Sequence, residues 1–138
     1  MTGIAWGENI TNDQIQFTKE LFKHTSKIYE FSEDYLDIFL ALTSSGPAII
    51  ALIIEALSDG GLSGGLPKKL SEELVMEMII GTISLIKEKN LTTSELKNLV
   101  TSPGGTTISA LRVLEKKSIR SALIESIISA SNRSKEFN

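Results

Sequence analysis

The sequence has no cysteine and only one histidine among its 138 residues. Without cysteine there can be no disulfide, no thiolate metal site and no cysteine nucleophile. The single histidine, His24, stands between Lys23 and Thr25 at a predicted helix end, where a solvent-facing or capping role is far commoner than catalysis. A triad or a histidine-ligated metal site would depend on this one residue. We therefore predict no metal site.

An excess of positive charge and a long apolar run are also missing. The 14 lysines and arginines are outnumbered by 17 acidic residues, which does not suit a protein that binds nucleic acid through a basic face. The most apolar stretch, Ala48 to Leu57, is far shorter than the roughly 20 residues that a membrane span needs. The first residues show no signal-peptide pattern. We expect a soluble cytoplasmic protein with no nucleic-acid or membrane partner.

The spacing of apolar residues predicts an almost entirely α-helical fold. Residues 1–31 predict a short strand at Ile4–Trp6, a helix over 13–25 and an extended segment over 26–31. We find neither a Gly-x-Gly-x-x-Gly motif after a strand nor a βαβ pattern. The remaining predicted helices cover approximately 34–42, 48–57, 70–90, 93–100, 107–116 and 118–135.

Two glycine- and proline-containing stretches are predicted to separate these helices. Thr43–Pro47 should end one helix and Pro47 should begin the next. The glycines of Asp59–Pro67 should end a helix rather than bind phosphate, because no strand precedes them and no lysine has the required register.

Almost every predicted helix has a broad apolar face, and the helix at Ala48–Leu57 is apolar on every side except for Glu55. This is more apolar surface than a short monomer can hide, so we expect an obligate helical dimer or a larger assembly. Gly81 inside the long helix should mark a place where another helix crosses closely. Glu55 or Asp59 should pair with Arg112 or Arg120.

The stretch Thr101–Thr107 combines a proline, two glycines and two threonines just before an amphipathic helix. Pro103 stiffens the turn, and Gly104 and Gly105 allow close approach of the backbone. Thr106 or Thr107 is predicted to cap the helix, whose first N–H groups have no partner in the helix. Such a stretch is either an ordinary loop and cap or a site for a small anion.

An ordered series of motifs resembles one family, the pyrroline-5-carboxylate reductases. The series comprises Ser44–Ala48, Glu55–Asp59, Gly65–Pro67, Gly81, Glu95–Lys97, Val100–Thr107, Leu114–Glu115, Arg120 and Asn132–Glu136. Each motif alone is weak, but their order and spacing together are highly specific. The resemblance covers about Asp34 to Lys135 and continues more faintly towards the start.

The resemblance implies the C-terminal half of a two-domain enzyme. Residues 1–31 would be a strand-helix-strand remnant of the dinucleotide-binding domain. Residues 32–138 would form an all-α, intertwined dimerisation and substrate-binding domain of the 6-phosphogluconate dehydrogenase C-terminal-like class. The family reduces 1-pyrroline-5-carboxylate to L-proline with NADPH or NADH. Because the cofactor would be bound mainly by the missing domain, we expect this chain alone to be inactive.

The resemblance also implies a binding site in the stretch described above. Backbone N–H groups of the loop, with substrate-binding residues Ser102, Gly104, Gly105, Thr106 and Thr107, would hold the substrate carboxylate. The catalytic hydroxyl of Thr107 would lie near the imine nitrogen. Pro47 would lie near the nicotinamide.

The sequence departs from the family pattern at two places. Ser44–Ala48 replaces the usual Gly-Ser-Gly-Pro-Ala and is followed by Ile49 instead of an aromatic residue, and Thr92-Thr93 replaces the common His-Pro. Two alternatives from other classes stay open. One is a non-catalytic assembly or regulatory relative that keeps only the dimer fold, and the other is an unrelated helical partner-binding protein.

Overall fold

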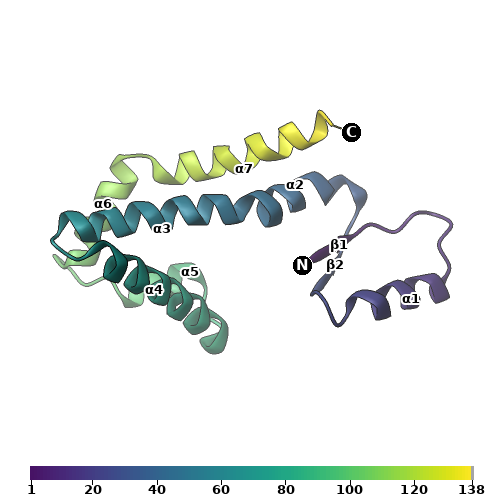
Figure 1. The fold of residues 1–138 in the computed structure, drawn as a ribbon, viewed down its shortest axis with the longest axis horizontal. Helices are drawn as coiled ribbons and strands as arrows, with labels where there is room; N and C mark the ends of the chain where they lie inside the picture. The colour runs from purple at the N-terminus through teal and green to yellow at the C-terminus, as the bar shows by residue number, and fades with distance from the viewer. Residues whose placement is uncertain (138) are drawn as a thin grey trace. The chain divides into compact units, whose positions relative to one another are not determined.

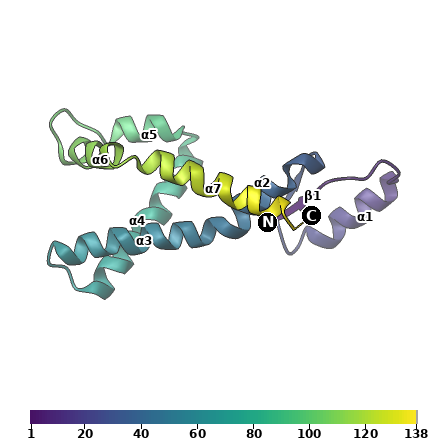
Figure 2. The same cartoon turned by 90° about the horizontal axis from the view of Figure 1, so that it is seen from above.

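The computed structural model describes residues 1–137 and confirms the nearly all-α prediction (Figure 1 and, seen from above, Figure 2). Its elements are β1 Thr2–Ile4, α1 Asn12–Phe22, β2 Ile28–Glu30, the 3-10 helix η1 Glu33–Tyr35, α2 Leu36–Leu40, the π-helix η2 Ala41–Ser45, α3 Gly46–Ser63, α4 Lys68–Lys89, α5 Thr93–Leu99, α6 Thr106–Lys116 and α7 Ile119–Lys135. The chain forms two compact units. The first holds Met1–Pro47 and the chain from Ile124 onward, and the second holds Ala48–Leu123.

In the first unit, β1 and β2 pair in parallel, with Gly3 opposite Tyr29, and α1 is the crossover between them. The predicted order of strand, helix and extended segment over residues 1–31 is thus confirmed, with the first strand at Thr2–Ile4 instead of Ile4–Trp6. The expectation that the sequence contains no βαβ pattern was wrong. Strands of three residues are too short for their periodicity to stand out from a loop. A Cβ at Gly3 would lie within 3 Å of the rings of Phe31 and Phe39, so the strand needs a glycine there to accept these aromatic side chains.

The sole tryptophan also belongs to this unit. The indole Nε1 of Trp6 donates to the carboxylate of Glu30 at 2.8 Å, and Lys19 Nζ lies 2.8 Å from the same carboxylate. These partners, Lys19 before Trp6, lower the pKa of Glu30. The contacts tie α1 and the segment after β1 to the end of β2.

The predicted break at Thr43–Pro47 does not occur. Helical structure runs without interruption from Glu33 to Ser63, through the π-helix Ala41–Ser45 and into Gly46 and Pro47. A π segment changes the hydrogen-bond register of the backbone, so the chain reaches Pro47, which has no N–H to donate, without ending the helix. The hydroxyl of Thr43 donates to the carbonyl of Phe39 at 2.7 Å, bonding back along the same helix.

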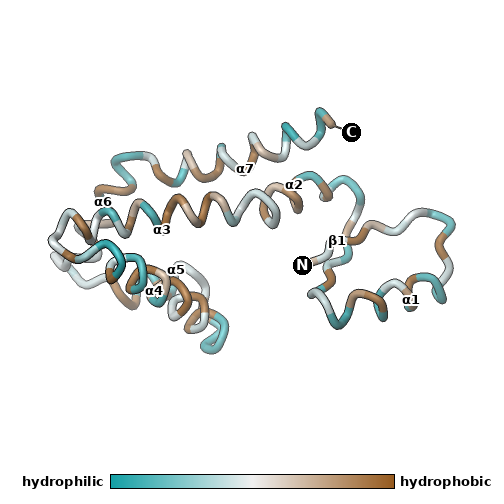
Figure 3. Tube along the Cα trace, viewed as in Figure 1, coloured by the Kyte–Doolittle hydropathy of each residue, from teal (hydrophilic) through white to brown (hydrophobic). Residues whose placement is uncertain are grey.

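This continuous helix removes the length argument against a membrane span. Glu33–Ser63 covers 31 residues with a mean hydropathy of 1.9, which is long and apolar enough to cross a bilayer by length and composition alone. Helices in the core of soluble proteins pass the same test. Figure 3 shows the hydrophobic colour that runs along α3. Only 6% of the apolar window is buried within the chain, so this helix lacks the apolar contacts that would remove it from water.

In the second unit, α3 and α4 meet through two buried serines. The hydroxyl of Ser71 donates to the carbonyl of Ser58 at 2.7 Å, and the hydroxyl of Ser58 donates to the carbonyl of Ile54 at 2.7 Å. A Cβ at Gly61 would lie 2.1 Å from the Ser71 oxygen. Gly61 is therefore glycine because α4 approaches α3 at this point.

Helix α3 extends farther than predicted, through Gly60 and Gly61 to Ser63. It ends in a Schellman motif, in which Gly65 has a φ of 98°, the Leu66 N–H donates to the Gly61 carbonyl and the Gly65 N–H donates to that of Leu62. Glycines end the helix, as expected, but the pair that does so is Gly64 and Gly65, because Gly60 and Gly61 are still helical. The predicted end of the long helix at about residue 90 is confirmed, since α4 ends at Lys89 and Asn90 adopts the left-handed conformation with a φ of 51°.

The predicted ion pairs between Glu55 or Asp59 and Arg112 or Arg120 were wrong. Asp59 pairs with Lys68 at 2.6 Å, and Arg120 pairs with Glu115 at 2.6 Å. Glu55 is exposed, and within residues 1–137 no ion pair joins it to Arg112. Because Glu55 is exposed on this chain, its carboxylate does not require an arginine partner within the chain.

The described residues form almost no buried core. Only four of them are buried, and Ala41 is the only hydrophobic one; the others are Ser58, Ser71 and Ser131. Large apolar side chains stay exposed along α3, α4 and α7. This chain therefore forms helices whose apolar faces lack most of the contacts that stabilise helices in globular proteins.

Candidate functional site

The loop between α5 and α6 is a tight turn that requires both of its glycines. Gly104 has a φ of 69°, which favours glycine. The N–H of Gly105 donates to the carbonyl of Ser102 at 3.1 Å. A Cβ at Gly105 would lie 2.4 Å from the Ser102 hydroxyl and 3.2 Å from its carbonyl oxygen. The Ser102–Gly105 turn is thus fixed by its backbone.

The prediction that Thr106 or Thr107 caps the following helix was wrong. Gly105 occupies the N-cap position without any side-chain hydrogen bond, and α6 begins at Thr106. Thr106 and Thr107 are therefore the first two helical residues. The signal that favours threonine as a cap was overridden by the extended backbone of Gly105, whose ψ is 175°.

The shifted start of α6 leaves donors unused at its N-terminus. Among the described residues, the N–H groups of Thr106, Thr107 and Ile108 make no hydrogen bond, and neither do the hydroxyls of the two threonines. The contrast with α1 and α5 is direct, since Thr11 and Thr92 cap those helices in complete capping boxes with Gln14 and Glu95. The first N–H groups of α6 are therefore available to an anion, whereas α1 and α5 use theirs to bond their own capping side chains.

The structure brings the five predicted substrate residues together, because they are consecutive parts of this turn and helix start. Ser102, Gly104 and Thr106 are exposed, while Gly105 and Thr107 are half-buried. Pro47 is the second residue of α3 and is exposed; it lies in the first unit, whereas the loop lies in the second.

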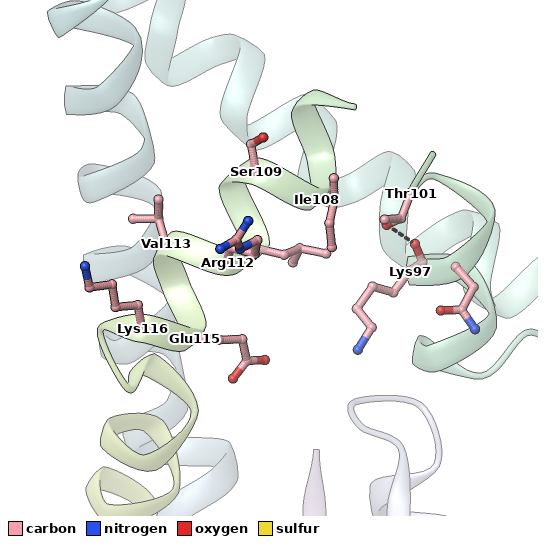
Figure 4. Close-up of a pocket in the computed structure, with 10 residues that line it drawn as sticks. Lys97, Thr101, Ile108, Ser109, Arg112, Val113, Glu115 and Lys116 are labelled. Atoms are coloured by element: carbon pink, nitrogen blue, oxygen red, sulfur yellow. Dashed lines mark hydrogen bonds between the residues drawn. The ribbon is translucent and has the colours of Figure 1, made fainter. Parts of the chain in front are cut away.

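A cavity of about 640 Å³ adjoins the loop between α5 and α6. Its lining includes Lys97, Thr101, Ile108, Ser109, Arg112 and Glu115. Figure 4 shows the side chains of Lys97 and Glu115 extending into the gap between the two helices, and the Thr101 hydroxyl bonded to the carbonyl of Lys97.

The negative charge of Glu115 in this cavity is partly neutralised by Arg120, which lies outside the cavity lining. Arg120 donates to Glu115 at 2.6 Å, and this bond, with smaller Coulombic help from Arg120 and Lys97, lowers the pKa of Glu115. The sequence analysis did not place Lys97 or Arg112 at a site. The helical spacing of Ile108, Arg112 and Glu115 could have shown that they share a face of α6. Thr107 is not among the residues that line this cavity, whereas Ile108 belongs both to the cavity and to the free start of α6.

The chemistry available at the loop is anion binding. Three backbone donors at a positive helix end, with two free hydroxyls beside them, suit a carboxylate or another small anion. Among residues 1–137 no cluster of acidic or histidine side chains could hold a metal ion.

Comparisons with known proteins agree on one family. Residues 33–137 match the family model described as pyrroline-5-carboxylate reductase dimerisation. A Synechocystis pyrroline-5-carboxylate reductase is 42% identical over 137 residues, which cover 99% of this chain and 51% of the relative. The Glycine max enzyme of the same name is 37% identical over 135 residues, covering 98% of this chain and 49% of the relative.

Solved structures give the same result. The chain resembles a Plasmodium falciparum pyrroline carboxylate reductase with NADP bound, with a TM-score of 0.88 and 30% identity over 97% of this chain and 52% of that chain. A reductase from Streptococcus pyogenes gives a TM-score of 0.90 and 27% identity over the same shares. This chain thus spans about half the length of the relatives that it matches, and it matches their C-terminal part.

Proposed function

Because this chain belongs to the pyrroline-5-carboxylate reductase family, we propose that it supplies the substrate-binding half of that enzyme. The whole protein would reduce 1-pyrroline-5-carboxylate to L-proline with NADPH or NADH. The single observation that carries this proposal is the uncapped start of α6, where donors are free beside Ser102–Gly105.

The loop fits the carboxylate of the substrate. The N–H groups of Thr106, Thr107 and Ile108 would donate to the carboxylate oxygens, with the helix dipole favouring the negative charge. The tight turn at Gly104 and Gly105 keeps side chains away from the approaching ligand. The Thr107 hydroxyl, unbonded within the described chain, would then orient the imine nitrogen and assist its protonation.

The residues of this chain do not by themselves form a dinucleotide site. The sequence contains no Gly-x-Gly-x-x-Gly motif, and β1 and β2 are the only strands among the described residues. When bound to the whole protein, the nicotinamide would supply a hydride to the imine carbon, and a proton taken up at the nitrogen completes L-proline. Pro47 would lie beside this ring. Residues 1–31 fit a remnant of the cofactor domain, since a parallel pair of strands normally belongs to a larger sheet.

The remaining functional assignments follow the family. Residues 32–138 would form the dimerisation and substrate domain, and the exposed apolar helices support a homodimer or a larger assembly of dimers. We also propose a cytoplasmic location without nucleic-acid or membrane partners. The acidic balance of the chain and the dimerisation description of the matching family support this view over a membrane-spanning α3.

A chimera tests the proposal. The dinucleotide-binding half of the Synechocystis reductase would be joined to this chain, and oxidation of NADPH and NADH would be followed with 1-pyrroline-5-carboxylate. We expect turnover by the chimera and none by the isolated chain. A folded chimera that binds NADPH but never turns over would support the alternative, an assembly relative without catalysis. Turnover by the isolated chain would contradict the division of roles.

Substitutions of Thr107 within an active chimera test the site itself. Thr107→Val removes the hydroxyl at nearly constant volume and should lower kcat by about 10- to 100-fold, as expected for lost orientation or proton transfer. Thr107→Ser should restore most of the activity. Ser109→Ala, at an exposed position of the same helix, is the matched control and should change little. Equal activity of all three variants would remove Thr107 from the mechanism.

A further inference from the structure

Gly81 is a glycine in the middle of a long helix that nothing in its own fold explains. Gly81 lies in the interior of α4, where glycine costs about 1 kcal/mol relative to alanine. Its φ is not positive, so the backbone does not require it. A Cβ at this position would meet no atom within 4 Å. The expected crossing of another helix at Gly81 therefore does not occur within this chain.

The other glycine at a helix crossing behaves differently. Gly61 is required by its own chain, because a Cβ there would meet the hydroxyl of Ser71 at 2.1 Å. Gly61 thus shows how this fold uses glycine where two helices approach. Gly81 is likewise a glycine within a long helix, but no second helix of this chain approaches it.

Large apolar side chains surround Gly81 on the open side of α4. Leu74, Met78 and Leu85 are 49%, 50% and 40% exposed, and their spacing places them in one stripe with Gly81 between Met78 and Leu85. The half-buried face of α4, which includes Val75 and Ile79, lies on another side of the helix. The stripe has the spacing of a helix-packing seam.

The accessible surface of the chain indicates how much area a partner would bury. The chain exposes 10660 Å², whereas a folded monomer of its mass, 15.0 kDa, exposes about 7,000 Å². The difference of roughly 3,600 Å² per chain corresponds to about 7,200 Å² over two copies, which is as large as the extensive interfaces of obligate dimers, about 2,000–5,000 Å² or more in total.

The occupant that fits is a second copy of this chain. Residues 33–137, which contain the whole of α4, match a family model described by dimerisation. Lipid does not fit α4, because Glu73, Glu77 and Glu88 interrupt its surface. We propose that a helix of the second copy crosses α4 at Gly81 at short range, seated between Leu74, Met78 and Leu85. This inference rests on the proposed membership of a dimeric reductase and adds the contact that sets the helix separation.

The physical reason is the distance between helix axes. Helices whose contacts carry side chains pack 8–10 Å apart, and a glycine at the crossing allows the backbones to come closer. A larger residue at Gly81 would push the partner helix outward and open the contacts of the whole stripe, since packed interfaces do not absorb added volume.

Sedimentation equilibrium of the full chain and of Gly81→Leu tests this inference. We expect Gly81→Leu to raise the dimer dissociation constant about tenfold or more. Gly60→Leu is the matched control, because Gly60 is also a helical glycine with open space at its Cβ position, and it should change dimerisation far less. Far-UV circular dichroism should show the helices retained in both variants. Equal dissociation constants for the Gly81 and Gly60 variants would overturn the assignment.

The absence of cysteine allows a second measurement that does not depend on a bulky residue. Gly81→Cys should react slowly with a maleimide in the dimer and quickly after dilution to monomers, whereas Gly60→Cys should react quickly in both. Fast labelling of Gly81→Cys in a proven dimer would also overturn the crossing. A wild-type chain that is monomeric at every concentration would instead contradict the dimeric premise of the proposed function.

Discussion

Two glycine-containing turns connect helices in the second unit, and they differ in whether their polar backbone groups are bonded within the chain. The turn Gly64–Pro67 between α3 and α4 bonds its own carbonyls in a Schellman motif, while Gly61 and Ser71 hold the two helices together. The turn Thr101–Gly105 between α5 and α6 closes on itself through Ser102 and Gly105 and leaves the next helix without a cap. Turns of similar composition thus differ in their hydrogen bonding: the first bonds its polar groups within the chain, and the second leaves the donors of the next helix free. Glycine content alone does not distinguish a structural turn from a binding turn.

The largest expected effect falls on the closed turn. Gly61→Ala places a methyl group against the Ser71 oxygen, so Ser71 must give up its buried bond to Ser58 or the helices must separate. We expect a loss of about 1–3 kcal/mol in the free energy of unfolding, measured by urea denaturation. Gly60→Ala, with nothing near its Cβ position, should be neutral or stabilise by up to about 1 kcal/mol. Equal losses in both variants would break the distinction between the glycines.

The open turn should respond to a change of backbone freedom. Gly104→Ala forces alanine into the left-handed region, since φ is 69°, and should cost about 1–2 kcal/mol. Gly104→Asn should cost less, because asparagine tolerates this region. If alanine and asparagine are equally tolerated, the turn adopts another conformation in solution. Thermal unfolding of the three proteins provides the measurement.

Side-chain capping at α5 provides the contrast to the uncapped α6. Thr92→Ala removes the hydroxyl that accepts from the Glu95 N–H and should cost about 1 kcal/mol. The matched change at the start of α6, Thr106→Ala, removes no hydrogen bond within the described chain and should leave the unfolding midpoint almost unchanged. A comparable loss at Thr106 would show that its hydroxyl stabilises the folded chain after all.

The same capping box predicts a dependence on pH. The Thr92 backbone N–H, followed by its hydroxyl, donates to Glu95 and lowers the pKa of that carboxyl below 4.5. Its stabilisation is therefore complete above pH 4.5 and is lost as the pH falls through the lowered folded-state pKa. Glu95→Gln should keep the cap, as Gln14 does in α1, and show a smaller loss of stability between about pH 5 and pH 3. Identical acid profiles would remove Glu95 as a contributor.

The smallest effect should come from the ion pair that spans the closed turn. Lys68 lies 2.6 Å from Asp59 and 3.5 Å from Glu72, all with exposed side chains. Exposed pairs contribute little, because water screens them and their side chains lose freedom. Asp59→Asn should lower the melting temperature slightly in dilute buffer and not at all in about 1 M salt, where the screening length is about 3 Å. A large effect that survives salt would show that Asp59 contributes to this turn by more than a screened surface ion pair.

The sequence allowed the positions of most helices to be predicted, because apolar spacing and capping residues are local signals. The end of the long helix near residue 90 and the start of the short helix at Thr93 are examples that the structure confirms. The π-helix at Ala41–Ser45 was missed, because proline after glycine normally ends a helix and an unusual hydrogen-bond register has no compositional mark. The parallel pairing of β1 and β2 was missed because it depends on contacts between residues far apart in sequence.

At the candidate site, residue types were predictable but their exact backbone roles were not. Proline, two glycines and two threonines identified the stretch, whereas the cap moved from threonine to Gly105. That shift depends on the turn closing between Ser102 and Gly105, which a pattern of residue types does not encode. The roles of Ser102, Gly104, Gly105, Thr106 and Thr107 in binding substrate, and of Pro47 beside the cofactor, stay predictions.

Trp6 gives the chain an intrinsic fluorescent reporter confined to one of its two units. It is the only tryptophan, it belongs to the βαβ segment, and its indole is bonded to the Glu30 carboxylate. Emission will therefore follow the opening of that segment and will be insensitive to the melting of α4, α5 or α6, which circular dichroism detects. A temperature scan in which the two signals separate would give the βαβ segment and the helical unit individual melting points.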